Sequence, residues 1–312
     1  MNLTSDLEKR YTTEQQTALE AQRLAQQIAF APVAFQVSRL MVKLGVFSVL
    51  SETSEGLTLT QIAEATKLSA YAVQILLEAS LSIGTVIVRD NRFLLTKAGW
   101  FLLRDKTTQI NMDFVQEVCY LGLNHLEEAL IEGKPAGLKV FGSWPTIYEG
   151  LSELPAEAQQ KWFAFDHYYS DYSFADALNI IFKQDVHTLL DVGGNTGRFA
   201  LRCVDFNPKV QVTIMDLPQQ LSLMQEHIKG KKGAERIHAY PANLLDVAVP
   251  FPTGFDVIWM SQFLDCFSPE EVTSILKRAA AAMTADSCLY ILEAYWDRQQ
   301  HETGAYCLTH IS

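Results

Sequence analysis

The chain has 312 residues, of which 48% are hydrophobic, so it can build folded cores and is not a disordered protein. Its length predicts two domains, and its net charge of −11 disfavours nonspecific binding to nucleic acid or to an anionic membrane. No run approaches about 18 consecutive apolar residues, so no membrane span is expected.

The N-terminal segment predicts helices. Its first residues, "MNLTSDLEKRYTTEQQ", are polar and mixed in charge, unlike a secretory signal. Apolar residues then recur at three- and four-residue spacing over residues 19–50, which is typical of helices. Pro32 is expected to separate or kink two of these helices, and Gly45 to mark a helix end.

The next segment has the residue order of a winged helix. A capping box at Thr58–Gln61 predicts a short helix, and Ser69 predicts the start of a second helix that ends at Gly84. Residues 86–88 and 93–96, separated by the polar turn "RDN", predict a two-stranded wing.

Two functions are open for this winged helix. A DNA-binding recognition helix needs donors against base edges and phosphates, yet residues 69–83 contain no Lys or Arg. Their apolar excess favours packing within a domain or between subunits. We therefore interpret residues 1–104 as a winged-helix dimerisation domain, with a transcriptional regulator as the alternative.

The middle segment, residues 105–185, is helical by its apolar period. Its second half is rich in aromatic side chains, namely Trp162, Phe163, Phe165, Tyr168, Tyr169, Tyr172 and Phe174. These residues could form a packed helix–helix core, or one side of the helix could face a flat organic ligand. Both interpretations stay open.

The C-terminal part predicts a parallel, doubly wound α/β sheet. Short apolar strands alternate with helices, and the strands are expected in "TLLDV", "VQVTIMDLP", "RIHAYPANL", "FDVIWMSQFL" and "CLYILEAYW". Ligands of such sheets bind beyond the carboxyl ends of the strands. The five cysteines are scattered without a C-x-x-C pair, so we expect no disulfide framework, no metal and a reducing cytoplasm.

A glycine turn and a downstream acid narrow the ligand. The chain contains neither the dinucleotide fingerprint G-x-G-x-x-G nor a P-loop. Gly193 and Gly194 let a ligand approach the backbone closely, and Asp216 can accept hydrogen bonds from two ribose hydroxyls. An adenosine-type ligand without a pyrophosphate, S-adenosylmethionine, satisfies both requirements. The alternative is a plain strand–helix turn with Asp216 as a helix cap.

With these motifs the chain resembles the class I S-adenosylmethionine-dependent methyltransferases. It is most similar to the plant-type small-molecule O-methyltransferases, such as the caffeic acid and hydroxyindole enzymes. The resemblance rests on "LLDVGGNTG", "MDLP", "MSQFLDCFSPEEV" and "LYILEAYW" and covers nearly the whole chain. It implies a Rossmann-like cofactor domain over residues 186–312, a substrate-lining connector over residues 105–185 and an N-terminal domain that builds a homodimer.

The resemblance also implies cofactor contacts. Gly193 would lie under the methionyl part of the cofactor, and Asp216 with Leu217 would hold the ribose. Asn243 and Leu244 occupy the positions that face the adenine in the family.

Two further positions are implied to lie at the cofactor. Ser261 stands where the plant enzymes often carry Lys, and Ser173 matches a serine near the cofactor's carboxylate.

Asp265 falls where the family has its catalytic His, and Glu293 falls where the family has a Glu that braces that His. A helix cap is not needed from Asp265, because Ser268 and Glu271 already form a capping box. A carboxylate with an ordinary pKa near 3.9 is a poor base, but burial beside a second carboxylate raises such a value. We expect Asp265 and Glu293 to share the base role or to orient an acidic hydroxyl.

The sequence ends at Ser312, before the last two strands of the family's sheet. Either the sequence is truncated or something else covers the fifth strand, which would otherwise be an exposed apolar edge. The expected function is S-adenosylmethionine-dependent O-methylation of a small, aromatic hydroxyl compound, without nucleic acid, membrane or metal. The alternatives are a cofactor-binding homologue that has lost or changed methyl transfer, and the winged-helix regulator.

Overall fold

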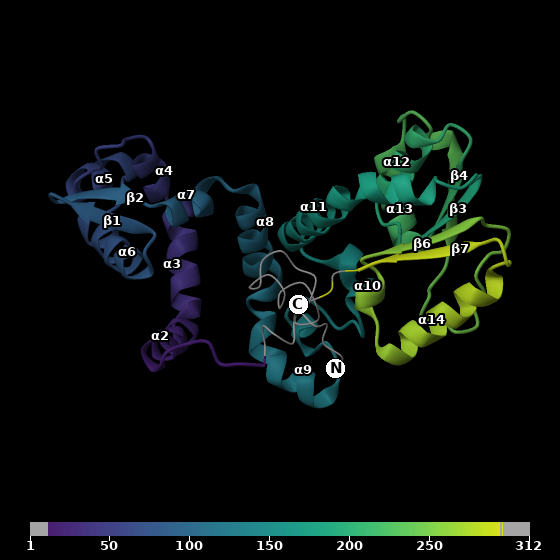
Figure 1. Ribbon diagram of the computed structural model, residues 1–312, viewed down its shortest axis with the longest axis horizontal. Coiled ribbons are helices and arrows are strands. Elements are labelled where there is room, and N and C mark those ends of the chain that lie inside the picture. The colour runs from purple at the N-terminus through teal and green to yellow at the C-terminus, as the bar shows by residue number, and fades with distance from the viewer. Residues whose placement is uncertain (1–11, 294, 296–312) are drawn as a thin grey trace. The chain divides into compact units, whose positions relative to one another are not determined.

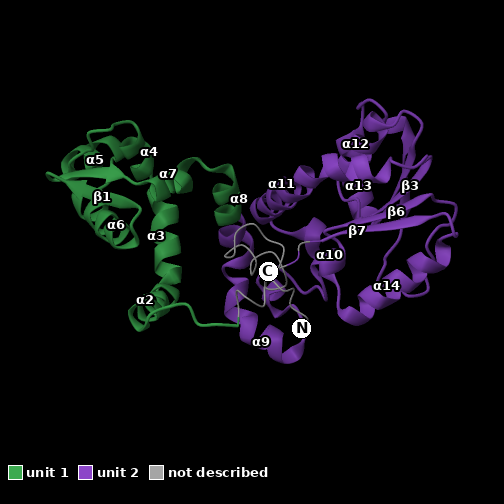
Figure 2. Cartoon of the chain, in the orientation of Figure 1, with its two compact units in different colours: residues 1–113 green, residues 114–312 purple. Residues whose placement is uncertain are grey.

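The computed structural model describes residues 12–293 and residue 295. The chain forms two compact units, residues 1–113 and residues 114–312, which are coloured separately in Figure 2. The first unit is mostly helical, and the second contains a parallel sheet (Figure 1). No helix within residues 12–293 combines the length and the apolar character that crossing a membrane requires.

The first unit contains seven described helices and one hairpin. These elements are α2 (Ala18–Ala29), α3 (Ala31–Lys43), α4 (Val46–Ser51), α5 (Leu59–Thr66), α6 (Ala70–Ile83), β1 (Val86–Arg89), β2 (Arg92–Leu95), α7 (Lys97–Arg104) and α8 (Lys106–Phe114), which runs one residue into the second unit.

Local signals in the sequence fix where these helices begin and end. Pro32 lies in the first turn of α3, where its missing N–H costs nothing. The capping box at Thr58–Gln61 opens α5, and the Ser69 side chain accepts the N–H of Ala72 at the start of α6. Gly84 ends α6 in the left-handed conformation. These predictions are confirmed.

Helix α2 has an apolar face that the first unit does not cover. None of its residues is buried, and Leu24 and Ile28, one turn apart, are 40% and 66% exposed. Phe30 and Val33, which follow at the start of α3, are also exposed. The core of this unit lies elsewhere, around Phe47 and the inner sides of α3 to α7.

The second unit begins with short helical pieces and one long helix. These are η1 (Val115–Cys119), η2 (Gly122–His125), α9 (Leu126–Glu132), η3 (Ala136–Val140), α10 (Ile147–Gly150), η4 (Leu151–Glu153) and α11 (Ala156–Ile181). The Gly/Pro-containing stretch before α11 accounts for the breaks, because neither residue continues a helix well.

The sheet that follows is fully parallel within the described residues, which confirms the predicted α/β fold. Its order is β5-β4-β3-β6-β7, so the chain starts at the middle strand and winds outward in both directions. Its elements are β3 (Thr188–Val192), α12 (Arg198–Phe206), β4 (Gln211–Asp216), α13 (Pro218–Ile228), η5 (Ala234–Arg236), β5 (Ile237–Pro241), β6 (Val257–Ser261), η6 (Leu264–Cys266), α14 (Pro269–Ala282) and β7 (Cys288–Leu292). The predicted ending of the sheet concerns residues that lie outside the described part of the chain.

Both faces of the sheet are buried, which explains why its strands are continuously apolar. Side chains alternate along a strand, so Leu189 and Leu190 point to opposite faces and belong to different cores. Residues of α11, α12 and α13 pack on the face of Leu189, and Ile275 and Ala279 of α14 pack on the other. Figure 1 shows α14 across the sheet from α12 and α13.

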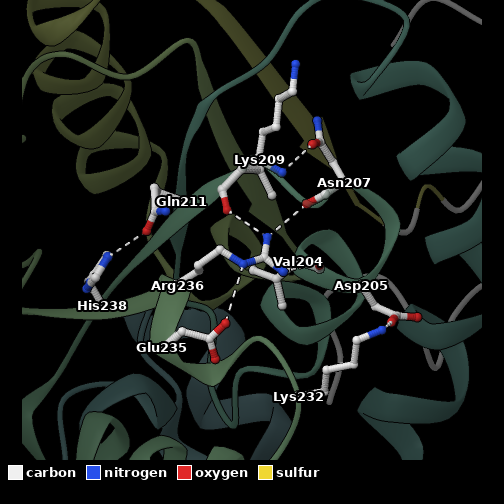
Figure 3. Close-up of polar contacts among 10 residues, drawn as sticks. Val204, Asp205, Asn207, Lys209, Gln211, Lys232, Glu235, Arg236 and His238 are labelled. Carbon is white, nitrogen blue, oxygen red and sulfur yellow. Dashed lines mark hydrogen bonds and ion pairs between the residues drawn. The ribbon is translucent and has the colours of Figure 1, made fainter.

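Arg236 lies near the end of the sheet at which the strands begin. Its guanidinium donates to the backbone carbonyls of Val204, Asn207 and Val210, the last two at 2.9 and 3.1 Å (Figure 3). One side chain thus satisfies three carbonyls between α12 and β4, because a guanidinium carries five N–H donors in a fixed plane.

Candidate cofactor and acceptor site

The carboxyl ends of neighbouring strands bring the predicted residues together. Gly193 follows β3, Asp216 ends β4, Ser261 ends β6 and Glu293 follows β7. Because parallel strands all end at the same edge, four distant positions of the sequence meet there.

The glycine turn after β3 is tight. The Gly193 N–H donates to the carbonyl of Met215 at 2.9 Å, and Gly193 has a φ of +70°, a conformation that favours glycine. A Cβ at Gly193 would lie 2.2 Å from Cδ2 of Phe263, and one at Gly194 would lie 2.8 Å from Oδ2 of Asp191. Neither position has room for a side chain.

Asp216 is buried and held in place by the turn. Its Oδ2 accepts the Asn195 N–H at 3.0 Å, and its Oδ1 accepts the Leu217 N–H at 2.8 Å. Burial raises the pKa of Asp216 to about 6, although these two hydrogen bonds oppose the shift. The carboxylate is therefore ionised at neutral pH and its direction is fixed.

Three cavities lie along this edge of the second unit. The central cavity has a volume of about 160 Å³, and its lining includes Tyr148, Trp162, Asp166, Gly193, Asp216 and Asp265. The apolar cavity has a volume of about 340 Å³, and its lining includes Val118, Leu123, Leu126, Leu138, Phe141 and Leu154. The small cavity, of about 50 Å³, is lined among others by Asp166, His167, Ser170, Asp191, Asn195 and Arg198.

Shared walls connect these cavities in series. The small and central cavities have four lining residues in common, Asp166, Gly193, Asn195 and Ser261. The central and apolar cavities also have four in common, Ile147, Trp162, Asp265 and Cys266. Asp265 therefore lies where the cavity beside the glycine turn meets an apolar chamber.

Several buried polar atoms in these walls have no hydrogen-bond partner among the described residues. They include Asp191 Oδ2, Asn195 Oδ1, Ser261 Oγ and both amide atoms of Gln220. A buried polar group without a hydrogen bond is costly, so such a cluster beside a cavity indicates a polar ligand. The donor and acceptor set fits S-adenosylmethionine, which presents ribose hydroxyls, an amino group and a carboxylate.

Glu293 holds the loop that carries Asp265. Its Oε1 accepts the N–H groups of Phe263 and Leu264 at 3.1 and 2.9 Å, and its buried Oε2 has no hydrogen-bond partner within residues 12–293 and residue 295. Burial, followed by the charge of Asp265, raises the pKa of Glu293 to about 7. The Glu293 carboxyl is therefore partly protonated near neutral pH.

Comparison with known proteins decides the family. Residues 123–310, more than half of the chain, match the model described as an O-methyltransferase domain, and residues 22–93 match a dimerisation2-like domain. The chain belongs to the O-methyltransferase domain family. It is an S-adenosylmethionine-dependent methyltransferase, as the sequence motifs predicted.

Individual relatives agree with this assignment. The L-tyrosine C(3)-methyltransferase of Streptomyces lavendulae is 28% identical over 260 residues, which cover 82% of this methyltransferase and 70% of the relative. The acetylserotonin O-methyltransferase of Macaca mulatta is 22% identical, covering 85% and 79% of the two chains. The apo structure of the S-adenosylmethionine-dependent methyltransferase SibL aligns with a TM-score of 0.66 at 25% identity, covering 90% and 83%.

Five predicted residues of this methyltransferase lie off the cavity walls. Within the described residues, Ser173, Leu217, Asn243, Leu244 and Glu293 are absent from the lining of all three cavities. Leu217 and Leu244 are buried in the core, and Asn243 accepts the Leu245 N–H. Ser170, one turn before Ser173, lines the small cavity instead.

Among the polar residues at the cavities that were not predicted, Asp166 and Gln220 line the central cavity. Asp166 on α11 lines both the central and the small cavity, and Gln220 on α13 lines the central cavity. The aromatic residues of α11 serve both as core and as cavity wall. Trp162 and Phe165 line the central cavity, whereas Phe174 packs in the core.

Asp191 should make the stability of this methyltransferase depend on pH. Burial, followed by the charge of Asp216, raises its pKa to about 7, from near 4 in the unfolded chain. The folded state therefore binds this proton more tightly, and its stability falls as pH rises from about 4 to 7. Asp191→Asn should raise the melting temperature of the cofactor-free protein more at pH 8 than at pH 5.

Thermal unfolding at the two pH values measures this difference. Asp286→Asn, at an exposed position, is the matched control and should shift both melting temperatures equally. Equal shifts for Asp191→Asn would mean that its carboxyl is not the titrating group.

Proposed function

We propose that this chain is an O-methyltransferase whose acceptor is a small aromatic hydroxyl compound, with Asp265 and Glu293 handling the hydroxyl proton. One observation carries the proposal: Asp265 lies in the wall shared by the central cavity and the apolar cavity. An apolar chamber of about 340 Å³ suits a compact ring system, and a carboxylate at its inner end suits a hydroxyl donor.

The central and small cavities would hold the cofactor. Asp216, fixed by two backbone N–H groups, would accept the ribose hydroxyls, with Gln220 beside it. Asn195 and Ser261 would meet the methionyl part with their unpartnered side-chain atoms. Bound S-adenosylmethionine supplies an electrophilic methyl group on a positively charged sulfur.

The connector before the sheet would determine which acceptor enters. Val118, Leu126 and Leu138 line the apolar cavity, and Trp162 belongs to the wall that it shares with the central cavity. These residues support the assignment of residues 105–185 as a substrate-lining connector between a dimerisation domain, residues 1–104, and a cofactor domain, residues 186–312.

Asp265 would accept the hydroxyl proton of the acceptor. Glu293 fixes the backbone on which Asp265 lies and has a raised pKa, so the two carboxylates can share that proton. The acceptor oxygen then carries more negative charge, which makes it a better nucleophile. The aromatic and apolar walls exclude water, which strengthens these interactions.

The test is methyl transfer to a panel of catechols, hydroquinones and hydroxyindoles. The protein is incubated with S-adenosylmethionine carrying a labelled methyl group, and the products are identified by NMR. Label on a phenolic oxygen supports the proposal. Binding of the cofactor without transfer to any acceptor supports a homologue that has lost the reaction.

Methylation at a ring carbon is a second candidate. It is favoured by the 28% identity to a relative whose name is L-tyrosine C(3)-methyltransferase. The same pair of carboxylates can take the phenol proton, after which the carbon next to the oxygen is also nucleophilic. The NMR spectrum separates the two products, because an O-methyl and a ring C-methyl group resonate in different regions.

The first unit would form a homodimer through a winged-helix domain. Helices α5 and α6 with the β1–β2 hairpin support the winged helix, and the match to a dimerisation2-like domain supports self-association. The exposed apolar face of α2 supplies a surface that a second copy can cover. The described cysteines, all free thiols, support the cytoplasm as its compartment.

Ile28→Glu should therefore dissociate the dimer. A charge at the centre of an apolar interface stays unpaired when buried, so association is lost. Light scattering after size exclusion should give twice the chain mass of 35.0 kDa for the wild type and the single mass for the variant. Gln27→Glu adds the same charge to α2 next to Ile28 and should remain dimeric. If Ile28→Glu remains dimeric as well, the face of α2 does not form the interface.

A further inference from the structure

Asp166 is a partly buried carboxylate in the cavity wall, and its side-chain hydrogen bonds come from neutral groups. The Asn195 side-chain amide lies 3.5 Å from its Oδ2. The Gln262 amide, with its nitrogen turned toward α11, donates to Oδ1 at 2.8 Å. Neutral donors orient a carboxylate, but they do not neutralise it.

The charged groups around Asp166 leave it without a full counter-charge. Asp171 on the same helix, Asp265 on η6 and Glu293 after β7 all add negative charge. Arg198 on α12 contributes positive charge near Asp166, but this cation is already paired: its Nε donates to Asp171 Oδ1 at 3.1 Å as part of an ion pair. A partly buried carboxylate among other negative charges destabilises the folded protein until a cation binds next to it.

The backbone beside Asp166 is strained. Gln262 has a φ of +46°, in the left-handed region that residues other than glycine usually avoid. This conformation accompanies the contact between its amide and Asp166. Strained residues held by their surroundings are concentrated at functional sites.

Asp166 lies at the junction of two cavities. It is one of the four residues that line both the small cavity and the central cavity. In S-adenosylmethionine, the sulfur joins the methionyl chain to the nucleoside. A cofactor with its methionyl part in the small cavity and its nucleoside in the central cavity places its positive charge at this junction.

We propose that Asp166 is the counter-charge for the sulfonium of the cofactor, and that through it the site prefers the charged cofactor to the neutral demethylated product, S-adenosylhomocysteine. The inference rests on the proposed placement of the cofactor in the two cavities. It assigns to Asp166 a function that the ribose-binding and acceptor-binding residues do not have.

The charge of Asp166 should couple cofactor binding to a proton. Burial, followed by Asp265, raises its pKa to about 7. A bound sulfonium lowers this pKa, so binding of S-adenosylmethionine at pH 7 releases part of a proton, whereas the neutral product releases none at this site. Affinity for the cofactor should fall as pH drops below about 7, and affinity for the product should not.

Calorimetry on the full chain tests the proposal. At pH 8, where Asp166 is ionised, Asp166→Asn should raise the Kd of S-adenosylmethionine at least about tenfold. The Kd of S-adenosylhomocysteine should change by less than about twofold, because that ligand lacks the sulfonium charge. Asp176→Asn, at an exposed position on the same helix, is the control and should change neither Kd.

The wild type provides a second arm that does not depend on a variant. Its preference for S-adenosylmethionine should grow from pH 6 to pH 8, and titration in two buffers of different ionisation enthalpy should reveal the released proton. Equal weakening of both ligands by Asp166→Asn would assign the residue to the amino group and overturn the proposal. A constant preference between pH 6 and pH 8 would also overturn it, and failure of the wild type to bind either ligand would instead refute the cofactor site.

Discussion

Asp265→Asn should lower kcat at least about 100-fold while leaving the Kd of S-adenosylmethionine nearly unchanged. Asparagine keeps the size of the side chain but cannot accept a proton from the acceptor's hydroxyl. Gly193 and Asp216, the proposed cofactor-binding residues, lie directly after β3 and at the end of β4, which this change does not touch. Steady-state kinetics with a phenolic acceptor and calorimetry with the cofactor measure the two effects separately.

The pH profile adds a second readout to the Asp265 experiment. Because burial and Asp265 raise the pKa of Glu293 to about 7, the wild-type kcat should increase as pH rises through that value and Glu293 loses its proton. Glu270→Gln, in the first turn of α14, is the matched surface control and should keep both the rate and the profile. Full activity of Asp265→Asn would remove Asp265 from the reaction.

Gly193→Ala should reduce cofactor affinity at least about tenfold. The new Cβ would lie 2.2 Å from the Phe263 ring, and Phe263 is buried with its N–H held by Glu293. The ring must move, and the backbone between Ser261, at the end of β6, and Asp265 moves with it. Calorimetry with S-adenosylmethionine and with S-adenosylhomocysteine should show weaker binding of both.

Gly230→Ala is the matched control for Gly193→Ala. Gly230 has a φ of +73°, against +70° for Gly193, so both variants carry the same left-handed strain of roughly 1–2 kcal/mol. Nothing lies within 4 Å of a Cβ at Gly230. Both proteins should lose thermal stability through this strain, Gly193→Ala should lose more because of its contact with Phe263, and Gly193→Ala alone should lose cofactor affinity. Equal affinities in the two variants would show that the contact with Phe263 is not what keeps the turn free of side chains.

Local signals made much of the fold predictable. Apolar runs placed the strands because both faces of the sheet are buried, and the Ser268–Glu271 capping box with Pro269 placed the start of α14. Gly193 and Asp216 could be assigned to one site because strand ends meet at one edge. For the strands and for α14, the residues that fix the element are neighbours in the sequence.

Residues whose position depends on packing could not be predicted in the same way. Aromatic side chains surround α11, so its period did not reveal that Asp166 and Ser170 face the cavities while Ser173 does not. Gln220 looks like an ordinary helix residue until β4 and α13 are assembled around it. The acid Asp166 and the amide Gln220 become recognisable as site residues only from their place in the cavity walls. That place depends on contacts between segments far apart in the chain.

The three backbone carbonyls that accept hydrogen bonds from Arg236, near the beginning of the strands, limit which side chains can replace it. Lysine has a single side-chain nitrogen and cannot donate to the carbonyls of Val204, Asn207 and Val210 in the same plane. Even the conservative substitution Arg236→Lys should therefore destabilise this part of the fold. That rim is about a strand length, roughly 17 Å, from the glycine turn. Substitution of Arg236 should therefore act on the stability of the fold, whereas substitution beside the glycine turn should act on ligand binding.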